Sequence, residues 1–244
     1  MSLLEVKEIY KSFGGNEVLK GVSFRVHEGE VLGIVGPNGS GKTTLLNIVH
    51  GLIRQDRGKV LFMGRDISRL RASKRARAGI GRTFQVTRLF SNLSVLENVL
   101  IPLHYGSDLP AERKVAESII DMVGLAHKID QPAGSLSLAQ RKRLELARAL
   151  ALNPKLLLLD EVFAGLSPAS VKEIVELLIR LRDEKGLTLI LVEHVLKALF
   201  QLAGRVIVLS EGRLIFEGEP EDMVKSPEVI KAYLGERYAR YENP

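Results

Sequence analysis

Two short segments of this 244-residue chain carry side chains that could act on a phosphorylated substrate. Residues 36–43, GPNGSGKT, fit the pattern G-x-x-x-x-G-K-[ST], in which backbone N–H groups surround phosphate oxygens. In such a loop the lysine, here Lys42, reaches the β- and γ-phosphates, and the hydroxyl of Thr43 coordinates Mg²⁺. The segment therefore predicts a site for a nucleoside triphosphate.

The second segment, residues 156–161, reads LLLLDE. The four leucines predict a buried strand, and ligands of open α/β sheets bind at the carboxyl ends of strands, so Asp160 is expected to hold Mg²⁺. Glu161 follows directly and is a carboxylate that could take a proton from an attacking water. An Asp-Glu pair after an apolar run is also typical of a surface turn, but the upstream loop favours the catalytic interpretation.

The elements around the glycine-rich loop fit its chemistry. The apolar run 31–35 predicts a buried parallel strand, and residues 44–49 predict a helix that Gly51 ends. The glycines allow a sharp turn, and the helix N-terminus adds about half a positive charge near the phosphates. The residues expected to bind the nucleotide here are Gly36, Asn38, Gly39, Ser40, Gly41, Lys42, Thr43 and Thr44.

Residues 136–140, LSLAQ, begin a further predicted helix. Ser137 is a typical helix N-cap, with Gln140 three residues later as its capping-box partner. Apolar residues follow at helical spacing, at Leu144, Ala147, Leu150 and Ala151. Charged residues are expected mostly on the other side of the helix, at Arg141, Lys142, Arg143, Glu145 and Arg148.

Five motifs in this order resemble those of the ATP-binding cassette (ABC) family, the ATPases that drive membrane transporters. The motifs are residues 36–43, Gln85, residues 136–140, residues 156–161 and His194, and the resemblance covers nearly the whole chain. It implies an α/β fold with a P-loop nucleotide-binding core on a mixed or parallel sheet, an antiparallel β subdomain and an inserted helical subdomain. It also implies hydrolysis of ATP with Mg²⁺, and a second copy that closes over the nucleotide.

The resemblance implies roles for residues whose types alone say little. Gln85 corresponds to the glutamine that touches Mg²⁺, His194 to the histidine at the γ-phosphate, and Phe13 to the aromatic residue that stacks on adenine. Tyr10 is a nearby competitor for the stacking role. Outside such a pattern, a lone glutamine or histidine is more often structural than catalytic.

The LSLAQ segment departs from the family signature Leu-Ser-Gly-Gly-Gln, because Leu138 and Ala139 replace both glycines. By resemblance, Ser137, Ala139 and Gln140 face the γ-phosphate bound by the other subunit. If position 139 needs a positive φ, alanine costs on the order of 1 kcal/mol more than glycine there. Ser167 is a further departure, at a position of the subunit-crossing loop where Asp or Asn is usual.

Within the family, the chain most closely resembles the ATPases of branched-chain amino acid importers. The motifs that carry this likeness are RTFQ at 82–85, RLF at 88–90, DEVFAGL at 160–166 and VIKAYLG at 229–235. The implied partners are a second ATPase subunit, identical or paralogous, and transmembrane permease subunits. The ATPase of a lipid or lipopolysaccharide exporter is the transport alternative.

Cassette ATPases that act on nucleic acid are the alternative from a different class. The repair and chromosome proteins of this kind insert coiled coils or zinc modules before the signature. Residues 86–135 show no sustained heptads and the chain has no cysteine, so we expect no nucleic-acid partner. The apolar segment 86–100 predicts instead a groove around Leu89 and Phe90 for a cytoplasmic helix of the permease.

The composition, 45% hydrophobic and 26% charged, is ordinary for a globular protein. No apolar stretch approaches the roughly 18–20 residues that span a bilayer, and the first residues carry no secretory signal. We expect a peripheral protein on the cytoplasmic face of the membrane that contacts it only through the permease. Residues 65–82 hold much of the net charge of +6, which favours a solvated basic face, with nucleic acid or acidic lipid as alternative partners.

The pattern of elements predicts one cassette over residues 1–244. Its nucleotide-binding core would comprise residues 1–85 and 151–217, its helical signature subdomain residues 86–150, and its C-terminal helical tail residues 218–244. Residues 1–26 predict antiparallel strands, a helix is expected near 67–77, and residues 206–216 predict a hairpin.

Overall fold

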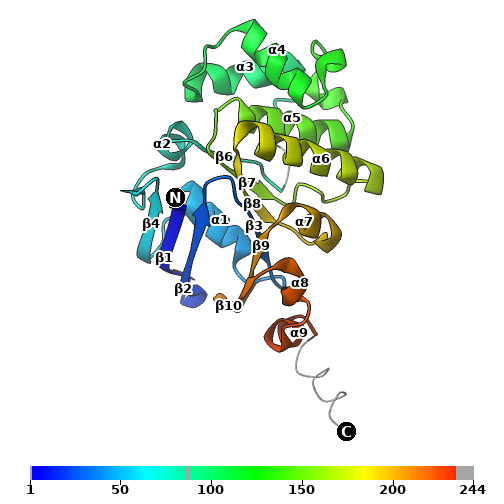
Figure 1. The fold of residues 1–244 in the computed structure, drawn as a ribbon. Helices are drawn as coiled ribbons and strands as arrows, with labels where there is room; N and C mark the ends of the chain where they lie inside the picture. The colour runs from blue at the N-terminus through cyan, green and yellow to red at the C-terminus, as the bar shows by residue number, and fades with distance from the viewer. Residues whose placement is uncertain (1, 86–87, 235–244) are drawn as a thin grey trace. The chain divides into compact units, whose positions relative to one another are not determined.

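The computed structural model describes residues 2–85 and 88–234 of the chain (Figure 1). The chain forms two compact units, one made of residues 1–70 and 190–244 and the other of residues 71–189. The C-terminal tail was predicted for residues 218–244, so part of it lies outside the described residues. The core, signature and tail ranges predicted from the sequence divide the chain by function and not by compactness, so they stay predictions.

The first unit contains an antiparallel sheet with the strand order β2-β1-β4-β5. Its strands are β1 (Ser2–Phe13), β2 (Asn16–His27), β4 (Arg57–Phe62) and β5 (Arg65–Asp66). Alternating residues of β1 and β2, such as Leu4 and Val26, are fully buried, as one covered face of an antiparallel sheet requires. The prediction of antiparallel strands over residues 1–26 is confirmed.

The same unit contains a second group of strands, which carries the glycine-rich loop. In this group β3 (Val31–Val35) pairs in parallel with β9 (Arg205–Ser210), and β9 pairs antiparallel with β10 (Arg213–Gly218). All five residues of β3 are buried, which explains its continuous apolar sequence. The hairpin expected over residues 206–216 is confirmed. The helices of this unit are α1 (Lys42–His50), α7 (Leu196–Leu202), α8 (Pro220–Met223) and α9 (Pro227–Leu234).

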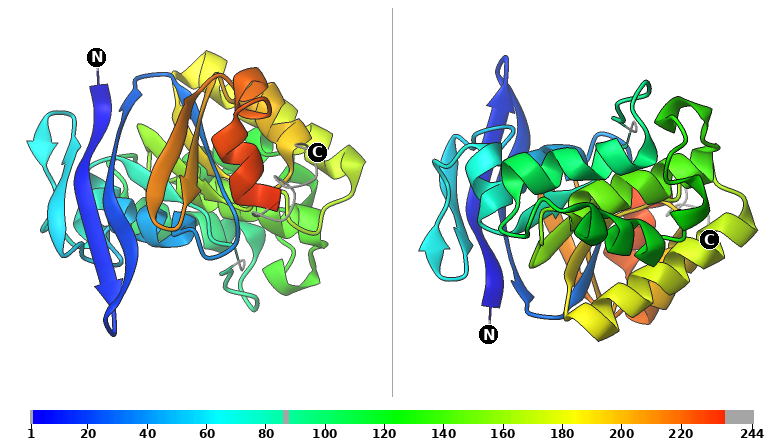
Figure 2. Two further views of the ribbon diagram at one scale, coloured as in Figure 1. Left: turned by 90° about the horizontal axis from the view of Figure 1, so that it is seen from below. Right: turned by 90° about the horizontal axis from the view of Figure 1, so that it is seen from above.

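The second unit is mostly helical in the range where helices were expected. It contains a parallel pair, β6 (Ile80–Arg82) and β7 (Leu156–Asp160), in which Arg82 lies opposite Leu158. Its helices α3, α4 and α5 pack on one another, as the views of Figure 2 show. The helix bounds are α2 Ala72–Arg77, α3 Val95–Gly106, α4 Arg113–Met122, α5 Leu138–Leu150 and α6 Pro168–Lys185. Two short 3₁₀ helices span Ala126–Lys128 and Ala133–Ser135.

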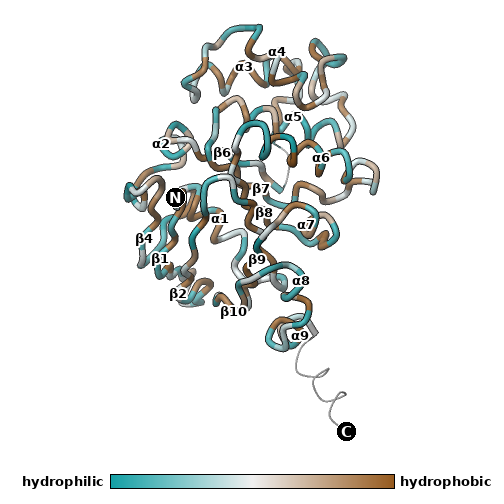
Figure 3. The backbone as a smooth tube through the Cα atoms, viewed as in Figure 1, coloured by the Kyte–Doolittle hydropathy of each residue, from teal (hydrophilic) through white to brown (hydrophobic). Residues whose placement is uncertain are grey.

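Hydrophobic residues are concentrated on the two strands that precede predicted site residues: Asp160 ends β7, and His194 follows β8 (Thr188–Val192). Figure 3 shows this along β7 and along β8, a strand that crosses the division between the units in the sequence. Every residue of β7 and β8 is buried. Within the described residues, the search for a helix with the length and apolar character of a membrane span finds none.

Two glycines of the loop give a prediction about its stability. A Cβ atom on Gly36, whose φ is 150°, would lie 2.1 Å from the backbone oxygen of Leu209. Gly39 also has a positive φ, 79°, but a Cβ atom there would meet nothing within 4 Å. We expect Gly39→Ala to lower the free energy of unfolding by about 1–2 kcal/mol, the cost of a left-handed alanine. Gly36→Ala should lower it by clearly more, because backbone atoms must also move.

Urea unfolding of both variants without nucleotide measures this difference. Gly39→Ala is the matched control, because it changes the same residue type in the same loop. Equal losses in the two variants would show that the contact with Leu209 does not constrain the loop.

Candidate functional site

The glycine-rich loop connects β3 to α1 in the first unit. Gly41 is the N-cap of α1 and has a φ of 103°, and a Cβ atom on it would lie 2.7 Å from a methyl carbon of Leu19. The predicted strand, loop and helix are therefore present, and the N–H groups of the first helical turn lie beside the loop. The Thr43 side chain is exposed, whereas Ser40 is buried.

Lys42 lies folded back over its own loop. Its Nζ donates to the backbone oxygens of Gly36 at 2.7 Å and Pro37 at 2.9 Å, and the residue is only 6% exposed. A buried ammonium needs oxygen acceptors, and the loop supplies them. Phosphate oxygens are stronger acceptors for the same group, because both partners are then charged.

Phe13 and His194, the other residues expected at the nucleotide, also belong to the first unit. Phe13 ends β1 before the Gly14-Gly15 turn and is 47% exposed, with Lys11 Nζ 5.2 Å from its ring centroid. The competing Tyr10 lies with its hydroxyl against Gly21 and with the Arg57 guanidinium 5.8 Å from its ring centroid. The greater exposure of the residue favours Phe13 over Tyr10 for the stacking role. His194 follows β8 and is exposed.

In the second unit, β7 ends at Asp160, which forms a buried ion pair with Arg82. Arg82 Nη2 donates to Asp160 Oδ2 at 2.9 Å, and each side chain is 2% exposed. Burial raises the pKa of Asp160, and the adjacent Arg82 guanidinium opposes that rise. Asp160 Oδ1 is buried and accepts no hydrogen bond from the described residues. A carboxylate oxygen left open in this way fits a ligand of Mg²⁺ or of its bound water.

Glu161 begins a tight turn directly after Asp160. Its φ is 50°, in the left-handed region that few residues other than glycine adopt. Gln85 Nε2 donates to Glu161 Oε2 at 2.8 Å. The structure therefore brings Gln85 to the carboxylate that the sequence marks as a base. The contact of Gln85 with Mg²⁺ stays a prediction.

Two charged residues of α5 are buried, although the sequence places them opposite the apolar residues of the helix. Lys142 and Glu145 are 2% and 4% exposed, and neither lies on a solvated face. Lys142 donates to the backbone oxygens of Gln85 and Glu161, and Glu145 Oε1 accepts from Phe84 N at 2.8 Å. Burial raises the pKa of Glu145, and the hydrogen bond from Phe84 opposes that rise.

Arg148 extends the same line of α5 by one turn. It donates to the backbone oxygen of Arg88, and its guanidinium lies 4.9 Å from the ring centroid of Phe90. Lys142, Glu145 and Arg148 are three residues apart, so one stripe of charges follows the segment after β6. That spacing is the signal in the sequence from which these contacts could have been predicted. The pairing of Arg82 with Asp160 was not predicted either, and the sequence holds no local signal for it.

The conformation at the start of α5 explains how residues other than glycine fit at positions 138 and 139 of the signature. Ser137 is its N-cap, and a capping box joins Ser137 and Gln140 in both directions. Ala139 is the second residue of the helix and has no positive φ, so it does not carry the cost considered above. Leu138 is 45% exposed. Ser167 likewise has a local role, as the N-cap of α6.

The structure thus groups the predicted residues in two sets. The set in the first unit contains Phe13, Gly36, Asn38, Gly39, Ser40, Gly41, Lys42, Thr43, Thr44 and His194. The set in the second unit contains Gln85, Ser137, Ala139, Gln140, Asp160 and Glu161.

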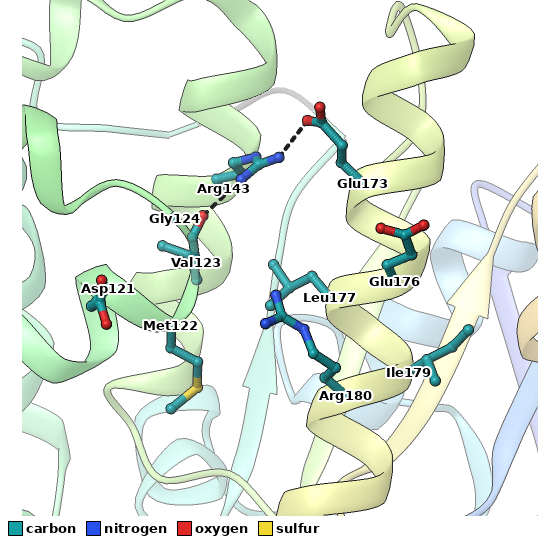
Figure 4. A pocket seen from close by; sticks show the side chains of 10 residues that line it. All are labelled: Asp121, Met122, Val123, Gly124, Arg143, Glu173, Glu176, Leu177, Ile179 and Arg180. Carbon is teal, nitrogen blue, oxygen red and sulfur yellow. Dashed lines mark hydrogen bonds and ion pairs between the residues drawn. The ribbon is translucent and has the colours of Figure 1, made fainter.

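A cavity of about 710 Å³ in the second unit is lined by none of the residues expected at the nucleotide (Figure 4). Its lining comes from α6, from the end of α4 and the turn after it, and from Arg143 of α5. Arg143 donates to the Val123 backbone oxygen at 3.1 Å and forms an ion pair with Glu173. These contacts fasten α5 to α6 and to the turn after α4.

Comparison with known proteins identifies the family. The model of the ABC transporter family matches residues 19–164, and the model of the branched-chain amino acid ATP-binding cassette transporter matches residues 213–239. The first match covers more than half of the chain and includes the glycine-rich loop, the signature position and the Asp-Glu pair.

Relatives and a solved structure agree with this match over nearly the whole chain. The lipopolysaccharide export system ATP-binding protein LptB of Haemophilus influenzae is 38% identical over 240 residues, 98% of this chain and 99% of LptB. The high-affinity branched-chain amino acid transport ATP-binding protein BraF of Pseudomonas aeruginosa is 35% identical over 250 residues, 96% of this chain and 98% of BraF.

The solved structure is the dimeric, post-hydrolysis state of the ATP-binding cassette MJ0796 bound to ADP and phosphate. It has a TM-score of 0.81 and 30% identity, over 89% of this chain and 98% of that one. With the mixed and antiparallel strand groups described above, this likeness confirms the predicted fold class. The chain therefore belongs to the ABC transporter family and is an ATP-hydrolysing subunit of that family.

Proposed function

We propose that this ATPase hydrolyses MgATP with Glu161 as the general base and uses the energy to drive solute transport through a permease. The observation that carries the proposal is the turn after β7. There Gln85 donates a hydrogen bond to the Glu161 carboxylate. The neighbouring Asp160 is buried, and its Oδ1 accepts no hydrogen bond from the described residues. A positioned base beside a metal-binding acid is the arrangement that phosphoryl transfer to water requires.

The loop residues bind the nucleotide in this proposal. Backbone N–H groups of residues 36–44 surround the phosphates, and Lys42 exchanges its loop acceptors for phosphate oxygens. Phe13 stacks on the adenine through its exposed ring. Thr43, Gln85 and Asp160 would hold Mg²⁺, Asp160 directly or through water, and the bound ion would supply charge neutralisation at the phosphates.

The hydrolytic step then has three protein contributions. Glu161 takes a proton from the attacking water, Lys42 stabilises the charge on the transferring phosphoryl group, and His194 holds the γ-phosphate. The hydrogen bond from Gln85 supports this role of Glu161, since it orients the carboxylate.

A second ATPase subunit completes the nucleotide site in the proposal. Ser137, Ala139 and Gln140 at the start of α5 face the γ-phosphate held by the other subunit, in a head-to-tail dimer with two-fold symmetry. Ser137 and Leu138 are exposed at this helix start. The dimeric cassette structure with ADP and phosphate supports such an assembly, formed by two identical chains or by this chain and a paralogue.

The proposed partner on the membrane side is a permease, which holds the ATPase at the cytoplasmic face. A cavity of about 350 Å³ is lined by Leu89, Ser91 and Leu138 together with Gln85, so an inserted permease helix would touch the segment that carries Gln85. Phe90 beside it is 46% exposed. This exposure argues against Phe90 as a core residue and supports the groove proposed from the sequence.

Branched-chain amino acids or related solutes are the proposed cargo. The match of residues 213–239 to the branched-chain amino acid cassette model and the likeness to BraF support this choice. Lipopolysaccharide export is the second candidate, because LptB is 38% identical over nearly the full length. The permease that co-purifies with the chain from its native source distinguishes the two.

The first test of the mechanism is Glu161→Gln, which keeps size and hydrogen bonding but removes basicity. We expect steady-state ATPase turnover to fall by roughly 10²–10⁴-fold, the usual contribution of a positioned base, while ATP affinity is unchanged. Light scattering with ATP should show a dimer of this variant, because the nucleotide that joins the subunits is no longer consumed.

Lys42→Ala is the control for this test, and it should weaken ATP binding itself. Turnover of Glu161→Gln near the wild-type rate, with ATP still bound, would remove Glu161 from the role of base. A monomer at high protein concentration with ATP bound would contradict the shared site.

The second test concerns the permease groove. Phe90→Asp places a charge on the exposed ring position, so we expect co-purification with the permease to be lost and nucleotide affinity to stay as in the wild type. Met63→Asp, which changes a 44% exposed side chain on the other unit, is the matched control and should keep the permease. Loss of folding in Phe90→Asp alone would show instead that Phe90 supports the core.

A further inference from the structure

Three hydrogen bonds join Lys142, Gln85 and Glu161 in a closed ring. Lys142 Nζ donates to the backbone oxygen of Gln85 at 3.2 Å and to that of Glu161 at 3.3 Å. The Gln85 side chain closes the ring by donating to Glu161 Oε2 at 2.8 Å. One ammonium therefore holds the main chain at both residues whose side chains meet.

The burial of Lys142 is costly, which makes its position informative. The residue is 2% exposed, and removal of an ammonium from water is expensive unless it is fully compensated. Both hydrogen bonds given above go to main-chain oxygens, and a buried charge is weak grounds for stability in general. A methionine of similar length would fill the space but would remove a cation that also acts on the buried carboxylates of Glu145 and Asp160. The ammonium therefore has a role other than packing.

The backbone of Glu161 is the part of the site that needs such support. Its left-handed φ of 50° costs an ordinary residue on the order of 1–2 kcal/mol. Its carbonyl oxygen accepts from Lys142 and also from Ala164 N at 3.2 Å. These two donors fix the peptide plane that follows the Glu161 Cα atom, so they restrict the orientation of that Cα atom and the directions open to its side chain.

We propose that Lys142 is a positioning residue for ATP hydrolysis, which acts by holding the backbones of Gln85 and Glu161 so that the Glu161 carboxylate is aimed at the attacking water. The inference rests on the proposed role of Glu161 as the base. Lys142 touches neither nucleotide nor water in this role. It stands five residues after Ser137 on the same helix, so α5 presents the signature at its start and orients the base from its second turn.

The test compares Lys142→Met, which keeps the length and removes the ammonium, with Lys142→Arg, which keeps a cationic donor. We expect Lys142→Met to lower kcat by about 10- to 100-fold, as expected for a reacting group misplaced by about 1 Å. The KM for ATP and the affinity for a fluorescent ATP analogue should stay within twofold of the wild type. Lys142→Arg should recover most of the lost kcat. Lys172→Met, an exposed lysine of α6, is the matched control and should leave all values unchanged.

A double-mutant cycle separates positioning from general support of the fold. If Lys142 acts through Glu161, Lys142→Met should cause no further loss of kcat in the Glu161→Gln background, because the base is already absent. A further loss of 10-fold or more in that background would overturn the proposal, and so would an unchanged kcat in Lys142→Met alone. If Lys142→Met does not fold, Lys142→Gln, neutral with an amide donor, enters the same cycle with the same criteria.

The cycle also distinguishes the two proposals. Near-normal turnover in Glu161→Gln would overturn the role of Glu161 as base and, with it, the role of Lys142. A large loss in Glu161→Gln, together with equal losses from Lys142→Met in both backgrounds, would overturn only the positioning role.

Discussion

The parallel pairing of β6 with β7 is the constraint on which the acidic turn depends. It sets Arg82 opposite Leu158, so the guanidinium reaches the buried carboxylate of Asp160 at the end of β7. Desolvation disfavours an ionised carboxylate, and the adjacent cation offsets that cost. Oδ2 of Asp160 is paired in this way, while Oδ1 accepts no hydrogen bond from the described residues. The register of two short strands therefore decides which oxygen of Asp160 is paired with Arg82.

Side chains of helix α5 bind the backbone of both the acidic turn and the segment after β6. Lys142 and Glu145 reach the backbone at residues 84, 85 and 161, and Arg148 reaches residue 88. Polar groups on one helix thus satisfy described backbone groups that lie outside the strands. The helix needs Ser137 only as a cap, and its first turn is ordinary α-helix. The start of α5 therefore tolerates Leu138 and Ala139 where the family has glycines.

The sequence predicted the features that depend on near neighbours. The apolar run of β3, the capping box of Ser137 and the hairpin before residue 218 follow from contacts within a few residues, and each is present. The ion pair of Arg82 with Asp160 joins positions 78 residues apart, and no local pattern announces it. The sequence placed Lys142 on the side of α5 opposite its apolar residues, and helical periodicity does not distinguish a solvated polar face from one that binds loop backbone. The roles given to individual residues at the nucleotide stay predictions.

The fold of Lys42 over its own loop has a consequence for the energetics of recognition. Its ammonium already holds two carbonyl oxygens at 2.7 and 2.9 Å, which keeps the main chain from Gly36 to Lys42 in a fixed curve. A phosphate that recruits the lysine replaces bonds rather than taking a cation from water, so its gain is a difference between two acceptor sets. Because the hydrogen bonds of Lys42 already order the loop, the loop would lose little conformational entropy when phosphate binds. In the proposed role of Lys42, a polyanion would therefore be selected over a single phosphate, since only several simultaneous contacts outweigh the hydrogen bonds that are given up.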